Sequence, residues 1–469
     1  MHQRVVFLTL FEGIEGKNLL RSPFVSHLLS GQDIKIVCFV KNDERKIGYE
    51  KLFKHPRLFF EAVDFPKTVW PEKIFATLKF YQIWTETTDL RAKMVKERDG
   101  QFFAYYFKLL LHRVLARRLM RVVIRFLDSR LIKDRTFKKY FKKYQPSLII
   151  CAQLFEEIEV HLVKRAKAEG VKTVCFINTW DKVTARNAFR VLVDKFITYN
   201  EIVKTELIEN DDVKAQDVYV SGIPQYDYFF DDSALEIIKE TFKIEVPKLR
   251  TREEFLNSIG LTKDERFIFY APVGSVYSND DWAIIDLLTE SIKQGQFGSG
   301  LELFVRFPPN DFVNKAESDK RKDLHFYAPG IRFSSKRGSD WDMSFADIMS
   351  LKETLKYSEL VICYASSISI DASIFEKPII NINFITRASS LMIKTPTAFY
   401  PMTHYQKALK TGAIDLASSK EEMIELIKGY IKSPDENRGN RDNLVARQCQ
   451  FKDGLAGKRM ADFVKSCLT

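Results

Sequence analysis

Residues 351–384 read LKETLKYSELVICYASSISIDASIFEKPIININF. The apolar run 360–363 has the length and composition of a buried strand, and the serine-rich stretch 365–369 ends it. A helical pattern over 370–375 follows, and Pro378 stops it before a second apolar run. The segment is therefore a compact strand, turn, helix and strand unit, typical of an α/β sheet.

The turn in this unit is suited to bind phosphate. A helix that starts there directs unpaired backbone N–H groups and the positive end of its dipole beyond Ser366 and Ser367. Two hydroxyls beside those amides suit a diphosphate. A serine before an apolar helix is also an ordinary N-cap, which any doubly wound sheet contains. The turn alone leaves both interpretations open.

Length and composition set the class of protein. A chain of 469 residues predicts two or three domains, and 45% hydrophobic with 29% charged residues is typical of a globular protein. No apolar stretch is long enough to span a membrane, and residues 1–11 lack a signal-peptide pattern, so we expect a cytoplasmic chain. The cysteines and the seven histidines are not spaced as disulfide or metal sites. We expect no metal and no cofactor.

The net charge of +11 comes from one region. Residues 101–145 contain thirteen Lys and Arg against Asp128 and Asp134, an excess equal to the charge of the whole chain. On a helical projection, five arginines fall within an arc of about 140°, and apolar side chains occupy the opposite side. These arginines are Arg113, Arg117, Arg118, Arg121 and Arg125.

Two interpretations of this basic helix are open. Either its apolar side packs on the protein's own core and leaves the arginines in solvent, or the helix lies on a membrane whose anionic head groups attract the basic face. The aromatic residues at 102–107 favour the second interpretation, peripheral association with the inner face of the cell membrane. The same charge would attract nucleic acid, but no nucleic-acid motif accompanies it, so we expect no nucleic-acid partner.

Alternating strand and helix patterns predict two α/β domains. The first spans 1–230 and carries the basic region as a helical insertion. Residues 231–265 read as an interdomain connection, 266–440 as the second domain, and 441–469 as terminal helices that pack back on the first. The expected strands are 4–10, 34–40, 147–151, 173–177, 195–198, 218–220, 267–270, 302–306, 331–333, 360–363 and 379–382.

Polar residues that follow these strands form the candidate site, because α/β sheets bind ligands at the carboxyl ends of their strands. An arginine, a Gly-Ser loop and a Ser-capped helix are the parts that bind a nucleotide diphosphate. Each residue also has a structural alternative, such as a solvated acid, a helix cap, a turn glycine or an ion pair between Arg306 and Asp311. The candidates are Glu12, Glu15, Asp181, Gly222, Pro224 and Gln225 in the first domain, and Gly274, Ser275, Arg306, Asp311, Ser366 and Ser367 in the second.

The order of four motifs resembles bacterial GT-B glycosyltransferases and the related CDP-glycerol glycerophosphotransferases of surface-polymer synthesis. The N-terminal FEGIEGKNLLRS at 11–22 is also similar to the acceptor-side loop and first helix of such proteins. The resemblance covers nearly the whole chain, and the last motif is its most specific part. The four motifs are NTWDKVTAR at 178–186, VSGIPQYDYFF at 220–230, FVRFPPND at 304–311 and SELVICYASSISIDASIFEKPIINI at 358–382.

The resemblance implies two Rossmann-like doubly wound domains facing across a cleft, with the acceptor held by the N-terminal domain and the nucleotide donor by the C-terminal one. By position, Arg306, Ser366 and Ser367 would contact phosphates, whereas Gly222 and Pro224 would shape the crevice between domains. Many relatives have Arg-Pro-His-Pro where this chain has Arg-Phe-Pro-Pro at 306–309. The histidine that supports the leaving phosphate is therefore missing, and Arg306 with the helix end would have to suffice, or the donor differs.

Transfer to an acceptor hydroxyl requires a group that takes its proton. Glu15, Glu12 and Asp181 are the candidates, and Glu15 is preferred because it lies in a loop between two glycines. Fixed amides and Arg306 would stabilise charge on the leaving diphosphate.

We therefore expect a membrane-peripheral glycosyltransferase that moves a sugar from a nucleotide-activated donor to a surface polysaccharide or lipid-linked glycan. Two reactions share the architecture: glycerol phosphate transfer from CDP-glycerol, and 2-epimerisation of a nucleotide sugar. The alternative from another class is a non-catalytic basic membrane-binding protein, which predicts binding governed by residues 113–143 and no affinity for a donor.

Overall fold

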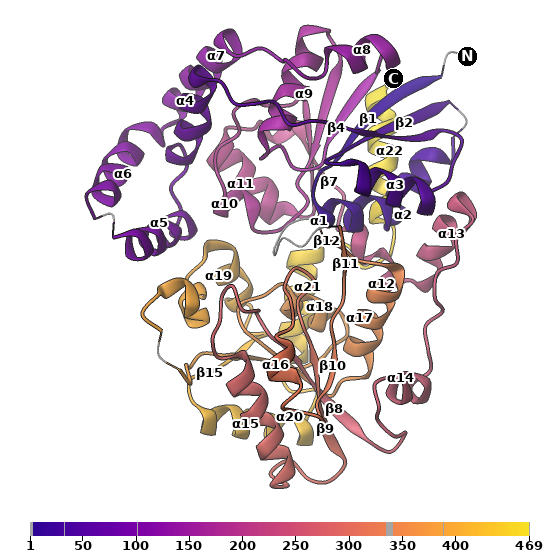
Figure 1. Ribbon diagram of the computed structural model, residues 1–469, viewed down its shortest axis with the longest axis vertical. Helices are drawn as coiled ribbons and strands as arrows, with labels where there is room; N and C mark the ends of the chain where they lie inside the picture. The colour runs from indigo at the N-terminus through magenta and orange to yellow at the C-terminus, as the bar shows by residue number, and fades with distance from the viewer. Residues whose placement is uncertain (1–2, 32, 101, 334–340, 388, 469) are drawn as a thin grey trace. The chain divides into compact units, whose positions relative to one another are not determined.

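The computed structural model describes residues 3–31, 33–100, 102–333, 341–387 and 389–468 and contains two compact units (Figure 1). Unit 1 comprises Met1–Lys96, Gln101–Glu245 and Arg447–Thr469, and unit 2 comprises Glu97–Gly100 and Val246–Ala446. The predicted limits at 1, 101 and 469 fall outside the described residues. The predicted connection is divided between the units at residue 245, and 441–446 belong to unit 2.

Unit 1 is built on a parallel sheet, in which the described residues form seven strands in the order β3-β2-β1-β4-β5-β6-β7. Strand β1 lies inside the sheet between β2 and β4, and it pairs with β2 from Arg4 opposite Ile34 to Leu10 opposite Val40. The order reverses between β1 and β4, which makes their carboxyl ends the topological switch point of this sheet. The strands are β1 (Arg4–Leu10), β2 (Ile34–Val40), β3 (Leu58–Ala62), β4 (Leu148–Cys151), β5 (Lys172–Phe176), β6 (Lys195–Thr198) and β7 (Val218–Val220).

Unit 2 repeats this topology with the strand order β10-β9-β8-β13-β14-β15, again parallel, and its switch point lies between β8 and β13. The predicted strand at 331–333 is not part of this sheet, because β11 (Ile331–Arg332) pairs antiparallel with β12 (Trp341–Asp342). The main strands are β8 (Arg266–Ala271), β9 (Leu301–Arg306), β10 (His325–Tyr327), β13 (Val361–Cys363), β14 (Ile379–Ile382) and β15 (Asp415–Ala417).

Helices cover both sheets, so the central strands are apolar along their length. The helices that precede β8 are α1 (Gly13–Glu15), α2 (Pro23–Leu29), α3 (Asp43–Leu52), α4 (Trp70–Leu78), α5 (Glu86–Asp99), α6 (Phe102–Leu115), α7 (Arg118–Leu131), α8 (Lys138–Tyr144), α9 (Glu157–Ala168), α10 (Lys182–Ala185), α11 (Glu201–Asp211), α12 (Asp227–Phe230), α13 (Glu236–Phe242) and α14 (Arg252–Ser258). Those that follow are α15 (Asp281–Lys293), α16 (Lys315–Ser318), α17 (Phe345–Tyr357), α18 (Ile368–Ile374), α19 (Thr403–Leu409), α20 (Lys420–Lys432), α21 (Arg438–Cys449) and α22 (Ala456–Leu468).

The last helix, α22, packs against α2 within unit 1. Buried Asp227 accepts hydrogen bonds from the amides of Ala456 and Gly457 at 2.9 and 2.7 Å and so caps this helix. A Cβ atom at Gly457 would lie 2.9 Å from the amide nitrogen of Phe24, which explains why glycine is needed where the two helices meet. No helix in the described part of the chain is long and apolar enough to cross a membrane.

The basic region contains the helices α6, α7 and α8, and the single arginine-bearing helix that the sequence predicted is divided into α6 and α7. The helix is interrupted at Arg117, whose extended backbone occupies the N-cap position of α7. Together with α4, the two helices share a small apolar core at one edge of unit 1 (Figure 1). Its members include Phe75, Leu115, Ile124 and Ile132.

The arginine side of α7 faces the protein, which corrects both interpretations of the sequence for Arg121 and Arg125. Arg121 donates to both carboxylate oxygens of Asp212, at 2.8 and 2.6 Å. Arg125 donates to Asp211 at 3.2 Å and to Asp212 at 3.1 Å. Burial alone would raise the pKa of Asp212, but hydrogen bonds and charge from the two arginines lower it. Arg113, Arg117 and Arg118 remain exposed.

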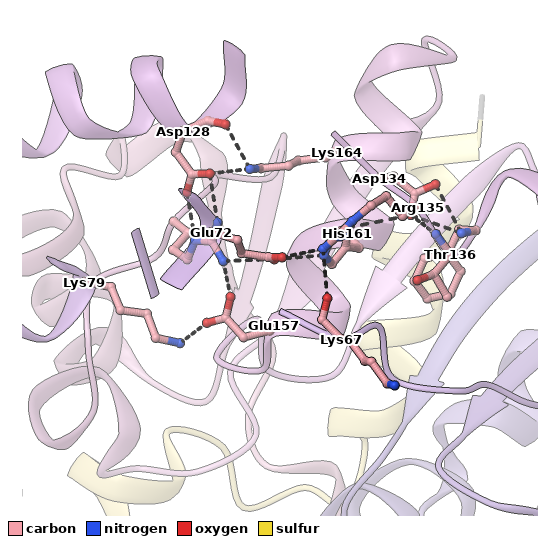
Figure 2. Close-up of polar contacts among 12 residues, drawn as sticks. Lys67, Glu72, Lys79, Asp128, Asp134, Arg135, Thr136, Glu157, His161 and Lys164 are labelled. Atoms are coloured by element: carbon pink, nitrogen blue, oxygen red, sulfur yellow. Dashed lines mark hydrogen bonds and ion pairs between the residues drawn. The ribbon is translucent and has the colours of Figure 1, made fainter. Parts of the chain in front are cut away.

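A buried ion-pair cluster attaches α7 to α9 (Figure 2). Asp128 of α7 accepts two hydrogen bonds from Arg190, at 2.8 and 2.9 Å, and pairs with Lys164 of α9. All three side chains are nearly inaccessible to solvent. Because burial disfavours a charged ammonium, the pKa of Lys164 is lowered even beside Asp128.

Helix α4 is attached in the same way. Its buried Glu72 accepts hydrogen bonds from Arg135 at 2.6 Å and from His161 Nε2 of α9 at 2.9 Å (Figure 2). Nearby, Glu157 of α9 pairs with Lys79 at 2.7 Å, just beyond the end of α4. Charged side chains therefore hold α4 and α7 on α9.

We expect Asp128→Ala to lower the free energy of unfolding by about 3–5 kcal/mol, because Arg190 and Lys164 would stay buried with one carboxylate fewer. Urea denaturation measures the loss. The matched control is Lys428→Ala, which removes an exposed pair with Glu425 and should cost less than about 1 kcal/mol. Equal small losses in the two variants would contradict a structural role for the cluster.

Candidate active site

The serine turn of unit 2 lies at the carboxyl end of β13, beside the switch point of the sheet. Helix α18 begins at Ile368, two residues earlier than predicted, and the Ile368 amide donates to Ser366 Oγ at 3.4 Å. Ser367 is exposed, and its side chain makes no capping hydrogen bond to the residues that the structure describes. The Ser367 hydroxyl therefore faces solvent at the carboxyl edge.

A buried polar cluster supports this turn from below. Cys363 Sγ donates to Asn381 Oδ1 at 3.1 Å, and Ser369 Oγ lies 3.1 Å from the hydroxyl of Tyr405, which also accepts from Asn381. Burial raises the pKa of Cys363 to about 12 and also raises that of Tyr405 above its ordinary value, so both keep their protons at neutral pH. A satisfied buried network of this kind fixes the loop above it.

The predicted Gly-Ser loop and Asp311 come together after β8 and β9. The Ser275 amide and hydroxyl donate to Asp311 Oδ2 at 2.6 and 3.0 Å. Gly274 has a φ of +92°, and a Cβ atom there would lie 2.7 Å from the same oxygen. Asp281 accepts from the Gly274 amide at 2.9 Å, and burial raises the pKa of Asp281 to about 6. Backbone and carboxylates thus hold this loop in one conformation.

A cavity of about 720 Å³ opens beside this loop. Arg387, in the loop after β14, is exposed and belongs to its lining, and the Arg387 amide donates to Asp280 at 2.8 Å. Arg387 was not among the predicted residues, although it follows the predicted strand 379–382 closely. The lining also includes Gly274, Ser275, Asp311, Trp282 and Phe307.

Arg306 is buried at the end of β9, and its guanidinium is engaged within unit 2. It donates to Ser350 Oγ at 3.0 Å and to the Asp347 carbonyl at 2.7 Å, and it lies 4.7 Å from the ring centroid of Tyr327. Burial lowers the pKa of Arg306 to about 10. Arg306 therefore joins β9 to α17 in this structure, and its contact with phosphate stays a prediction. Asp311 binds Ser275, as described above.

In unit 1, Glu15 is fully buried in the turn after β1. Its Oε2 accepts hydrogen bonds from the amides of Phe11 and Glu12, at 2.5 and 3.0 Å. Burial, followed by repulsion from Glu159 and Glu12, raises the pKa of Glu15 well above its ordinary value. These contacts give Glu15 a structural role, and its assignment as the proton acceptor stays untested.

Glu12 is partly exposed in the same turn and is held by Lys182, whose Nζ lies 3.2 Å from Glu12 Oε2. Lys182 also donates to Gln153, which follows β4. The loops after β1 and β4, the two strands at the switch point, therefore both supply partners of Lys182. Glu159 lies behind it, where burial raises its pKa to about 7. Lys182, Gln153 and Glu159 were missed, although Lys182 lies in the motif at 178–186.

The other predicted residues of unit 1 lie elsewhere along its loops. Asp181 is half-buried at the N-cap position of α10. Gly222 has a φ of +86°, and a Cβ atom there would lie 3.1 Å from the Cβ of Ala456. Pro224 and Gln225 form a short 3₁₀ turn with Tyr226. Close packing against the C-terminal segment of unit 1 is sufficient to explain Gly222.

No protein-family model and no curated protein sequence matches this chain. Solved structures do match it over nearly its whole length. A putative UDP-N-acetylglucosamine 2-epimerase from Listeria monocytogenes is 13% identical, with 99% of this chain and 96% of that one covered and a TM-score of 0.53. A UDP-GlcNAc 2-epimerase from Neisseria meningitidis, solved bound to UDP-GlcNAc, is 11% identical, with 98% and 100% covered and a TM-score of 0.52.

A glycosyltransferase from Rickettsia africae ESF-5 is 10% identical, with 100% of both chains covered and a TM-score of 0.50. At such low identity these likenesses concern the fold alone. With the two parallel sheets, they confirm the predicted GT-B fold of two Rossmann-like doubly wound domains. The resemblance to the CDP-glycerol family stays a prediction.

We expect Glu15→Gln to gain stability relative to the wild type as pH rises. Because the folded-state pKa of Glu15 is raised, its contribution is complete below the ordinary value of 4.5 and is lost as pH rises through the folded value. Glutamine keeps an oxygen for the two amides and does not ionise. The difference in Tm between variant and wild type should therefore increase as pH rises above 4.5.

Glu254→Gln is the matched control, since Glu254 also closes a capping box, at the start of α14. Hydrogen bonds from Thr251 lower the pKa of Glu254, so its contribution is present above the ordinary value of 4.5. This variant should lose Tm relative to the wild type only as pH rises toward 4.5, and above that pH the difference should stay constant. The same trend in both variants would contradict a raised pKa of Glu15 in the folded protein.

Proposed function

We propose that the protein is a glycosyltransferase that moves a sugar from a nucleotide-activated donor to a surface polysaccharide or lipid-linked glycan at the cytoplasmic face of the membrane. The observation that carries this proposal is the rigid serine turn after β13, beside the switch point of a Rossmann-like sheet. Ligands of open α/β sheets bind at such points.

The loops at the carboxyl edge of unit 2 favour a nucleotide diphosphate as the donor group. Ser367 presents a hydroxyl to solvent, and the Gly274 loop offers a rigid backbone beside a cavity of about 720 Å³. Arg387 lines that cavity, and Lys394 donates to the carbonyl of Ser275. Cations and the exposed Ser367 hydroxyl in loops at the carboxyl edge of one sheet suit phosphate oxygens. The structural neighbour bound to UDP-GlcNAc supports this choice of ligand class.

Glu12 is the residue of unit 1 that we propose as the proton acceptor. It is the partly exposed carboxylate of the β1 turn, whereas Glu15 is fully buried and holds the backbone. The acceptor hydroxyl would pass its proton to Glu12 as its oxygen bonds to the sugar carbon. The bond from that carbon to the diphosphate oxygen would break, and the nucleoside diphosphate would leave with the electron pair.

A donor screen tests the ligand class. One of the UDP-, GDP-, CMP- or CDP-linked compounds should raise the Tm of the protein. Ser367→Ala should weaken its Kd about ten-fold or more, because a hydrogen bond to a charged phosphate is lost. The control is Ser433→Ala, an exposed serine at the end of α20, which should leave Kd unchanged. Equal affinity in the wild type and Ser367→Ala, measured by calorimetry, would contradict the assignment.

The reaction product separates the candidate activities that share this fold. NMR of the donor after incubation distinguishes three products: a transferred sugar, a transferred glycerol phosphate, and a sugar inverted at carbon 2 without any acceptor. Inversion without acceptor would replace the transferase proposal with an epimerase, the activity named for two of the neighbours described above.

We expect Glu12→Gln to lower the release of nucleoside diphosphate by about 10²–10⁴-fold while the donor Kd stays unchanged, because it removes a proton acceptor and no donor ligand. Glu50→Gln, at an exposed position of α3, is the control. Normal turnover in Glu12→Gln, with loss in Asp181→Asn, would assign the proton transfer to Asp181 instead.

A further inference from the structure

The outward sides of α6 and α7 are apolar and form a surface that we call the apolar face. Phe103 of α6 is 93% exposed, and Leu119 and Phe126 of α7 are 72% and 56% exposed. Exposed apolar residues recur every three or four positions along each helix, so each helix presents them on one side. The face consists of Phe103, Tyr106, Phe107, Leu110, Val114, Leu119, Val122, Val123, Phe126, Leu127 and Leu131.

This arrangement inverts the usual packing of an amphipathic helix. A surface helix normally buries its apolar side and leaves its charges in water. Helix α7 instead buries Arg121, Arg125 and Asp128 in ion pairs with Asp211, Asp212 and Arg190. Buried ion pairs add little net stability compared with apolar packing, so the inverted orientation brings the fold no gain over the usual one. Exposed apolar surface of this extent marks an interaction site.

The exposed charges of α6, α7 and the junction between them have one sign. Arg113, Arg117, Arg118 and Arg130 are exposed, and both acidic residues of 102–144, Asp128 and Asp134, have buried side chains. Arg130 lies 5.2 Å from the ring centroid of Phe126, so positive charge is adjacent to the apolar face. Aromatic and aliphatic side chains bordered by arginines match the boundary of a bilayer with anionic head groups.

We propose that the apolar face docks on the surface of a bilayer that contains anionic phospholipid. Side chains such as Phe103 and Phe126 enter the boundary between head groups and acyl chains, and the four arginines bind lipid phosphates. The docking is peripheral and stands independently of the proposed enzyme activity.

Charge favours a lipid surface over a second copy of this chain. In a two-fold symmetric dimer the same patch meets itself. Arg113, Arg117, Arg118 and Arg130 of one copy would then be brought toward those of the other, and the exposed part of the face supplies no carboxylate to compensate. Anionic lipid compensates all four arginines at once.

Co-sedimentation of the full chain with vesicles tests this proposal. The wild type should bind vesicles of phosphatidylglycerol mixed with phosphatidylcholine, and bind phosphatidylcholine alone much more weakly. Val122→Ser with Phe126→Ser should lower binding to the mixed vesicles about ten-fold or more, because two apolar side chains no longer enter the bilayer. Ile47→Ser, on α3, changes an apolar residue that is 64% exposed and should bind like the wild type.

A second variant tests the charge without touching the apolar side chains. Arg118→Gln with Arg130→Gln should lower binding to the mixed vesicles about ten-fold and leave binding to phosphatidylcholine unchanged. Circular dichroism melts confirm that each variant is folded. Undiminished binding in the serine variant overturns the proposal. The proposal is also overturned if the wild type binds neither vesicle. If that wild type sediments as a dimer and the serine variant as a monomer, the face is an interface between two copies of the chain.

Discussion

The pairing of the α7 arginines with Asp211 and Asp212 decides which side of the helical insertion faces outward. Both aspartates lie at the end of α11, and the Asp211 carboxylate is fully inaccessible. A buried carboxylate without a cation costs several kcal/mol, so Arg121 and Arg125 must face the protein. Asp128 and Glu72 impose the same requirement through Arg190 and His161. The apolar side of α7 is left in contact with solvent as a consequence.

In both candidate sites, buried polar side chains hold the backbone that carries the exposed polar side chains. In unit 1, Glu15 holds the backbone of the turn from which Glu12 reaches solvent. In unit 2, the cluster around Asn381 and Tyr405 lies under the turn that carries Ser367. Groups held in place in this way lose little entropy when a ligand binds. Each switch point therefore combines a rigid buried layer with a small number of accessible polar groups.

The central strands could be predicted from sequence because they are long apolar runs, as at 4–10, 34–40 and 379–382. The edge strands β3, β10 and β15 were missed, since LFFEA, HFY and DLA contain no β-branched residue and each includes a polar one. The equally short edge strand β7, VYV, was predicted from its two valines. Helical periodicity identified the two sides of α7 correctly. It could not show that the arginine side is buried, because Asp211 and Asp212 are about ninety residues away in the chain.

The grouping of candidate site residues could be predicted from sequence, but their burial could not. Strand ends placed Gly274, Ser275 and Asp311 in one group, and the structure brings them together. Burial separates Glu15 from Glu12, and no sequence pattern distinguishes them.

The orientation of α7 can be measured directly by arginine modification with phenylglyoxal in the absence of lipid, followed by peptide mass spectrometry. Arg118 is exposed, whereas Arg121 and Arg125 are paired with aspartates and shielded from solvent. We predict rapid modification of Arg118 and Arg130, with Arg121 and Arg125 protected until the protein unfolds. Equal modification of all four arginines in the folded protein would contradict the inward orientation of the arginine side.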